Sequence, residues 1–109
     1  MSGANDLIHQ ATRLRIMAAL NALPADAAIE FTRLRALVEA TDGNLGAHLD
    51  ALERATYVAI EKLFEGRKPK TRVRATAAGR RAFSDHVAYL RHIIDGSETG
   101  KIESDLTGS

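Results

Sequence analysis

Apolar residues recur at helical spacing along much of the chain, and this pattern is sharpest in residues 41–55. Leu45, Leu49 and Leu52 are spaced four and three apart, which predicts a helix with one narrow apolar stripe. Thr41 or Asp42 can cap its start by accepting a backbone N–H. The remaining positions are small or polar: Gly43, Ala47, Asp50 and Arg54 face away from the stripe, with Asn44, His48 and Ala51 on one flank.

Two runs rich in β-formers come after this helix. Residues 57–64 and 71–76 enclose the tip Glu65-Gly66-Arg67-Lys68-Pro69-Lys70, where glycine and proline favour a turn. The two runs therefore predict a β-hairpin. A helix followed by a cationic hairpin is the layout of a winged helix-turn-helix.

The N-terminal part of the chain also has a helical pattern. Asn5 or Asp6 can cap a helix that begins at Leu7 and continues through residues 11–23, and Pro24 ends it. Arg13 and Arg15 lie off its stripe and are expected to face solvent, although Arg13 can also reach a phosphate. The predicted inward stripe is Leu7, Ile8, Ala11, Leu14, Met17 and Ala18.

A second helix is predicted shortly before residues 41–55. Ile29-Glu30-Phe31 alternates like a very short strand that can pair with the hairpin, and Thr32 then caps a helix over residues 33–40. Two short helices with so short a connection are typical of a helix-turn-helix. Three residues of this helix are expected to face inward: Leu34, Leu37 and Val38.

The last predicted helix starts at Thr76 and runs to about Ile94. Its large apolar residues have the spacing of a seam between two helices, and they are Phe83, Val87, Leu90 and Ile94. This stripe favours a homodimer, although it can also cover the core of the domain itself. We expect one domain over residues 1–94, with a dimerisation helix at about 76–94 and a polar, mobile tail at 95–109.

Length and composition set the fold class. A chain of 109 residues suffices for one domain, and these elements make it mainly α with a small β-hairpin (α+β). The absence of cysteine excludes disulfides and thiolate metal sites. No apolar run reaches the length of a membrane span and the start does not resemble a signal peptide, so a cytoplasmic protein without a membrane partner is expected.

The charge distribution is uneven although the net charge is only +1. Residues 62–81 hold eight basic residues and one acidic residue, which leaves the rest of the chain with seven bases and thirteen acids. Such asymmetry favours a polyanion partner along one edge of the molecule. Cations that protect the edges of a solvated hairpin are the alternative interpretation.

No catalytic or cofactor-binding pattern is present, so we expect neither an enzyme nor a cofactor. His86 and His92 are six residues apart and point in different directions on a helix, so they cannot chelate one metal ion within a chain. Only a metal site between two subunits stays open. Gly43 and Gly46 open a helix but come after no strand, which does not fit a phosphate-binding loop.

These residues together resemble a known family. The chain is similar, over about residues 7–94, to the small single-domain winged helix-turn-helix transcriptional regulators related to the MarR and ArsR families. The resemblance is carried by short runs: residues 7–9 with 13–17, Gly43-Asn44-Leu45-x-x-His48-Leu49-x-x-Leu52-Glu53, Tyr57-Val58, residues 64–72 and Thr76-x-x-Gly79-Arg80.

The resemblance implies a dimeric regulator that binds double-stranded DNA, with helix 42–55 in the major groove and wing 65–72 on the minor groove or the backbone. The base-reading positions would be Asp42, Gly43, Asn44, Ala47 and His48. The wing contacts would be Arg67, Lys68, Lys70 and Arg72. The operator, the regulated genes and any small-molecule effector cannot be derived from the sequence.

Three departures from the family pattern matter. Relatives commonly have glycine at the position of Thr56, so Thr56 is either strained or marks a different helix end. Relatives often have proline where Ala77 stands, and alanine is harmless there. Few side chains of helix 42–55 can make bidentate base contacts, so readout would depend on Asn44, His48 and DNA shape.

Two other functions compete with a sequence-specific regulator. One is a winged-helix module for protein–protein contact, which the acidic residues on helix 42–55 favour slightly. The other is an architectural DNA binder without sequence preference, which would need only the wing and phosphate contacts.

Overall fold

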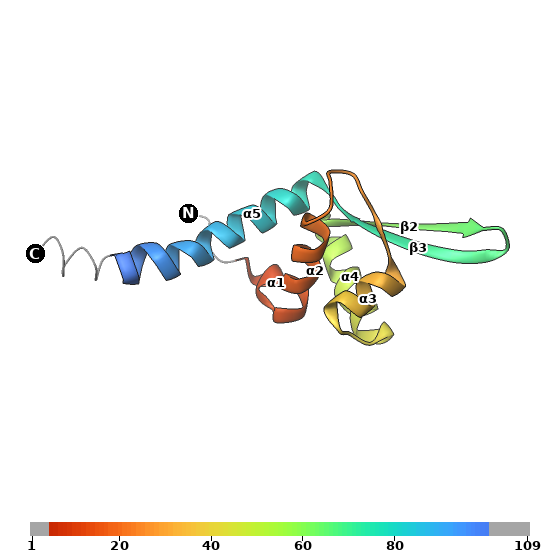
Figure 1. Ribbon diagram of the computed structural model, residues 1–109, viewed down its shortest axis with the longest axis horizontal. Helices are drawn as coiled ribbons and strands as arrows, with labels where there is room; N and C mark the ends of the chain where they lie inside the picture. Colours follow the sequence, from red (N-terminus) through yellow and green to blue (C-terminus); the bar gives the residue numbers. More distant parts are fainter. Residues whose placement is uncertain (1–4, 101–109) are drawn as a thin grey trace, which may run out of the picture.

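The computed structural model describes residues 5–100, in which helices surround one small antiparallel sheet. The helices are α1 (Asp6–His9), α2 (Ala11–Asn21), α3 (Phe31–Val38), α4 (Asp42–Arg54) and α5 (Ala77–Arg91), followed by a π-helical segment, η1 (His92–Gly100). The strands are β1 (Ile29–Glu30), β2 (Val58–Glu65) and β3 (Lys68–Ala75). In Figure 1, α1–α4 gather at the centre, the β2–β3 hairpin projects to one side and α5 to the other. The predicted winged helix with an additional C-terminal helix is confirmed.

Polar side chains cap three helices. In each, a side-chain oxygen accepts a hydrogen bond from the backbone N–H three residues further on, at 3.0 or 3.1 Å. The capping residues are Asn5 for α1, Thr41 for α4 and Thr76 for α5. The cap satisfies a backbone donor that the first turn of a helix leaves without a partner.

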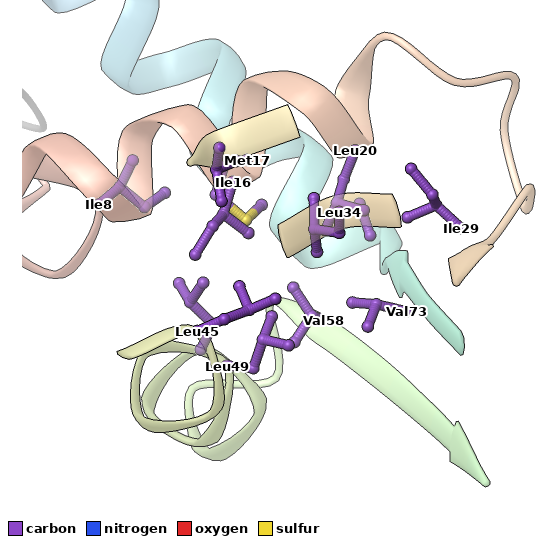
Figure 2. Packing of buried hydrophobic residues seen from close by; sticks show 13 residues of the cluster. Ile8, Ile16, Met17, Leu20, Ile29, Leu34, Leu45, Leu49, Val58 and Val73 are labelled. Carbon is purple, nitrogen blue, oxygen red and sulfur yellow. The ribbon is translucent and has the colours of Figure 1, made fainter. Parts of the chain in front are cut away.

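The core lies where α2, α3 and α4 meet the sheet (Figure 2). Leu45, Leu49 and Leu52 of α4 are at most 1% exposed, which confirms the predicted stripe. Burial of each leucine stabilises the fold by about 1.5–3 kcal/mol, so this stripe anchors α4 firmly. The other buried apolar residues are Ile8, Ile16, Met17, Leu20, Ile29, Leu34, Val38, Val58, Val73 and Ala75.

The N-terminal helix differs from its prediction. Gln10 has a ψ of 137°, an extended value, so the chain breaks into α1 and α2 and does not continue as one helix. Because the break rotates α2 relative to α1, it changes which residues face the core, and α2 ends before Leu23. Ala11 and Ala18 are exposed, while Ile16, Met17 and Leu20 are buried.

The α3 helix also departs from its prediction, because it begins at Phe31 and ends at Val38. Thr32 lies inside the helix and does not cap it; the N-cap residue is Glu30, which makes no capping hydrogen bond through its side chain. The start of α3 is positioned by the pairing of β1 with β3 and not by a side-chain cap. Leu37 is 59% exposed and not inward, since the buried side of so short a helix is narrow and holds only Leu34 and Val38.

The sheet has the strand order β1-β3-β2 with antiparallel pairing throughout. Ile29 pairs with Val73, so the short strand does join the hairpin as predicted, although it stops at Glu30. The β2–β3 register runs from Val58 opposite Ala75 to Glu65 opposite Lys68.

The hairpin tip is shorter than predicted. Only Gly66 and Arg67 lie between the strands, and Gly66 has a φ of +66°, which a type II′ turn requires at its first central position. Lys68, Pro69 and Lys70 therefore belong to β3 and not to the turn. A strand tolerates Pro69 because β3 pairs with β1 only at Arg72 and Val73, so its missing N–H removes no bond on that side.

The end of α4 and the start of α5 are held together at one point. Thr56 has a φ of +67°, and its left-handed conformation lets the Tyr57 N–H bond back to Leu52 O at 2.9 Å and ends the helix. The Tyr57 carbonyl in turn accepts the N–H of Thr76 at 3.0 Å. A Cβ on Gly79 would lie 1.9 Å from Tyr57 O, so only glycine allows α5 to approach this closely.

The C-terminal helix extends further than the predicted boundary at Ile94. Helical backbone continues through η1 to Gly100. The sequence did not predict this extension, because residues 95–100 are polar and a polar helix shows no apolar periodicity. The rest of the predicted tail, residues 101–109, lies outside the described residues.

We expect Thr56→Gly to stabilise the protein by about 1 kcal/mol, because a side chain in the left-handed region costs about 1–2 kcal/mol and glycine has no such cost. For a domain of this size the melting temperature should rise by roughly 4–8 °C. Thr32→Gly is the control, since this exposed threonine has ordinary helical backbone and glycine should destabilise it. A fall in melting temperature for Thr56→Gly would contradict the expected strain.

One histidine is part of the buried structure. His86 is fully buried on α5, and its Nδ1 accepts the backbone N–H of Asn5 at 3.1 Å. The rings of His9 and His86 meet edge to face with 5.4 Å between their centroids, and the Tyr89 ring stacks on His86 at 6.2 Å. Burial first, and then the nearby His9, lower the pKa of His86 from its ordinary value. His86 is therefore neutral at pH 7 and joins α1 to α5.

Acid should weaken this contact. Since folding lowers the pKa of His86, the unfolded chain binds the proton more readily, and stability should fall as the pH drops below about 6.5. The slope from one such group is at most about 1.4 kcal/mol per pH unit. His86→Asn keeps an acceptor for Asn5 without the titration, so it should flatten the pH dependence of the denaturation midpoint. Equal slopes in both proteins would contradict this assignment.

Candidate nucleic-acid interface

A tight turn sets the angle between α3 and α4. Glu39 has a φ of +55°, and Ala40 N donates to Arg35 O at 3.1 Å, which closes the end of α3. Thr41 comes directly after this turn and caps α4. The helix pair therefore has the predicted helix-turn-helix geometry.

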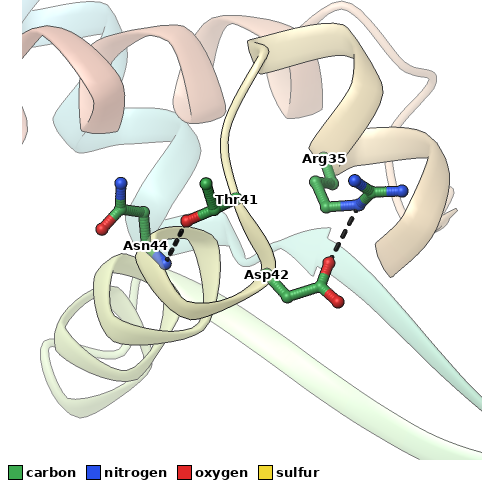
Figure 3. A network of polar contacts seen from close by, with 4 residues as sticks. All are labelled: Arg35, Thr41, Asp42 and Asn44. Atoms are coloured by element: carbon green, nitrogen blue, oxygen red, sulfur yellow. Dashed lines mark hydrogen bonds and ion pairs between the residues drawn. The ribbon is translucent and has the colours of Figure 1, made fainter.

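An ion pair joins the two helices at the same turn (Figure 3). Arg35 Nε of α3 lies 2.9 Å from Asp42 Oδ1 at the start of α4. Asp42 is one of the predicted reading positions, and its carboxylate is occupied by Arg35. This pairing offsets a charge that would otherwise repel phosphate. Arg35 was not among the predicted site residues, because nothing in its local pattern separates it from a solvent-facing arginine.

Three further reading positions lie open on the surface of α4. Gly43, Asn44 and Ala47 are exposed, and no atom lies within 4 Å of a Cβ built on Gly43. The Asn44 backbone N–H serves the cap, which leaves its side-chain amide available for other contacts. A partner can therefore approach the α4 backbone closely on this side.

His48 is held more firmly than its neighbours. Its Nδ1 accepts a hydrogen bond from Arg13 Nε on α2 at 2.9 Å. Burial first, and then the charge of Arg13, lower the pKa of His48. A neutral imidazole that accepts at Nδ1 carries its proton on Nε2, so His48 offers one donor. Arg13, which was expected to face solvent, thus orients a residue of α4.

The wing cations differ in their surroundings. Lys70 Nζ lies 3.0 Å from Glu30 Oε2 and 2.9 Å from Glu65 Oε1. Hydrogen bonds to Glu65 and Glu30 raise the pKa of Lys70, and the bond to Lys70 lowers the pKa of Glu65. Arg72 sits opposite Glu30 on one side and Glu61 on the other. The excess positive charge counted along residues 62–81 is therefore partly balanced by acids outside that segment.

The hairpin tip carries the other two predicted wing contacts, Arg67 in the turn and Lys68 at the start of β3. Arg67 and Lys68 are exposed, and no ion pair involves either of them in the described part of the chain. Lys68 pairs in register with Glu65, whose carboxylate is bonded to Lys70. The tip is thus the part of the wing with cations free to bind an anion.

The structure offers little for other chemistry. Within residues 5–100, no three histidine, cysteine or acidic residues come together as metal ligands would. None of the helices in the same range combines the length and hydropathy needed to cross a bilayer.

Comparison with known proteins agrees with this geometry. Residues 12–94 match the family model of the winged helix DNA-binding domain. An uncharacterised protein of Methanocaldococcus jannaschii is 32% identical over 92 residues, which are 84% of this chain and 97% of that protein. The solved structure of a transcriptional regulator homologue from Pyrococcus horikoshii OT3 is 28% identical with a TM-score of 0.76, and covers 84% of this chain and 88% of its own.

Two more distant structures share the fold alone. NadR in complex with 4-hydroxyphenylacetate has a TM-score of 0.63 at 18% identity, covering 94% of this chain and 77% of its own. FabT of Streptococcus pneumoniae in complex with DNA has a TM-score of 0.53 at 19% identity, covering 94% and 76%. The predicted resemblance to small winged-helix regulators is confirmed. The chain therefore belongs to the winged helix DNA-binding domain family, which is not a family of enzymes.

Proposed function

We propose that this protein is a DNA-binding transcriptional regulator that places α4 in the major groove and the tip of the wing on the adjacent minor groove or backbone. The observation that carries the proposal is the open surface of α4, with Gly43, Asn44 and Ala47 exposed beside a wing whose tip holds Arg67 and Lys68. A major groove admits an α-helix, and small residues let the helix backbone come close to the bases. The DNA in the FabT structure supports the same class of partner.

Base readout would depend on few groups. The Asn44 amide can pair with N6 and N7 of adenine, and the Ala47 methyl can contact the methyl of thymine. The Nε2–H of His48 is a donor for a base acceptor or a phosphate. With so few direct contacts, DNA shape and deformability would supply part of the specificity.

The α5 helix is the proposed dimer interface. Phe83, Val87 and Leu90 are only partly buried, Ile94 is 63% exposed, and in Figure 1 the helix extends away from the other helices. A second copy could cover this stripe by packing its own α5 against it, as symmetric dimers do. Two copies of α4 would then read two half-sites.

A protein–protein module is the second candidate. Asp50 and Glu53 are exposed on α4, and both would repel phosphate at close range. Binding of the protein to genomic fragments and random duplexes at two salt concentrations separates the candidates. A regulator retains a preference for certain fragments, an architectural binder treats all duplexes alike, and a protein module binds none.

Asn44→Ala should cost about 1–3 kcal/mol of binding to the preferred duplex and relax the preference at one base position in each half-site. Competition titrations with single-base variants of the duplex measure both effects. Glu53→Ala is the control, because Glu53 is exposed on the same helix but outside the proposed reading positions. An equal loss of affinity for every duplex would show that Asn44 contacts the DNA backbone and not a base.

Leu90→Asp should weaken association by about 3–5 kcal/mol if α5 forms the dimer seam, since it buries an unpaired charge there. The fold should remain intact because Leu90 lies outside the core cluster. His92→Asp places the same charge on an exposed position of this helix opposite the stripe and should leave the dimer unchanged. Sedimentation of all three proteins tests this, and a monomeric wild type at high concentration would refute the dimer.

A further inference from the structure

The pairing register divides the wing side chains between two faces. Side chains alternate along each strand, and directly opposite residues lie on the same face. One face continues the core side of the sheet, where Val58 and Val73 are buried, and reaches Lys62 and Phe64 near the tip. The other face carries the cations of β3 together with acids of β2: Lys68, Lys70, Arg72 and Arg74 with Glu61 and Glu65.

Acids of the same chain partly neutralise the cationic face. Lys70 pairs with Glu30 and Glu65, and Arg72 stands between Glu30 and Glu61 in the register. A groove of about 480 Å³ separates this face from the connection between α2 and α3, with Leu23 and Arg33 among its lining residues. These contacts brace the wing against the start of α3, so they fit a positioning role.

The opposite face looks toward α4. A groove of about 270 Å³ lies between them, lined by Ile60, Lys62 and Thr71 of the wing and by Gly46 and Asp50 of α4. Lys62 is exposed, and no ion pair involves it in the described part of the chain. This face is therefore continuous with the open surface of α4.

Phe64 is the unexplained residue of this face. It is 72% exposed near the tip, two residues before the turn, and belongs neither to the core nor to the residues packed against it. A large exposed aromatic side chain beside a cation suggests a contact surface. Proteins that bind the minor groove of DNA frequently insert apolar side chains there, between base steps.

We propose that the wing contacts DNA through the face that looks toward α4, with Lys62 on a phosphate and Phe64 against the deoxyribose of the adjacent minor groove. Arg67 at the turn completes this contact, while Lys70 braces the wing through its ion pairs with Glu30 and Glu65. The inference rests on the proposed function, because it specifies which residues of a DNA-binding wing meet the duplex. Double-stranded DNA fits as the occupant because the face continues from α4, and because Lys62 stands opposite Thr71 in the register with no acid across from it.

The test compares single substitutions on the two faces. Affinity for the duplex that wild type prefers is measured at several salt concentrations for Lys62→Ala, Phe64→Ala and Arg72→Ala. Lys62→Ala should make the log–log salt slope shallower by about 0.9 per bound subunit, because one phosphate contact is lost. Phe64→Ala should weaken binding roughly tenfold with little change of slope, as expected for partial burial of an aromatic ring. Arg72→Ala, the matched cation on the other face, should leave the slope unchanged.

Each other outcome overturns the inference in a distinguishable way. A shallower slope for Arg72→Ala with none for Lys62→Ala would show that the cationic face meets DNA. Loss of self-association by Phe64→Ala in sedimentation, with DNA affinity retained, would assign this face to a second copy of the chain. A wild type that binds no duplex would refute the proposed function as well. Thermal unfolding of each variant checks that these exposed substitutions leave the fold intact.

Discussion

The structure depends on the close approach of α5 to the Tyr57 carbonyl. This one oxygen accepts the Thr76 N–H, and Gly79 leaves room for it where any Cβ would clash. Thr76 also donates through Oγ1 to the carbonyl of Thr56 at 2.5 Å and caps α5. The end of α4, both ends of the hairpin and the start of α5 therefore meet at a single point. A shift there would move α4, the wing and the proposed dimer helix together.

This junction extends to the N-terminus of the described chain. The side chain of Asn5 donates to the Tyr57 hydroxyl at 3.0 Å, while its backbone N–H bonds to His86 on α5. The same asparagine caps α1. Asn5 thus links α1 to α5 and to Tyr57 at the end of α4. Such a network is strong only while His86 remains neutral, since a protonated ring cannot accept the Asn5 N–H.

Several charged side chains on the candidate interface are paired with other residues of the chain. Arg35 binds Asp42 at the start of α4, Arg13 orients His48, and Glu30 and Glu65 engage Lys70 on the wing. Each pair leaves a neighbouring small or uncharged group to face outward. The result is a helix α4 with open space beside Gly43, next to a wing that Lys70 braces on one face.

The local elements of this protein follow from its amino-acid pattern alone. The leucine stripe of α4, the caps at Thr41 and Thr76, and the hairpin all arise from contacts within a few residues, so pattern and propensity suffice to predict them. The partner of Lys70, forty residues earlier, and the bond from Arg13 to His48 depend on packing between separate elements. The faces of the wing depend on strand register, where a shift of one residue would exchange them. Only the tertiary structure decided these, because burial of Val58 and Val73 selects the register and long-range charges then pair within it.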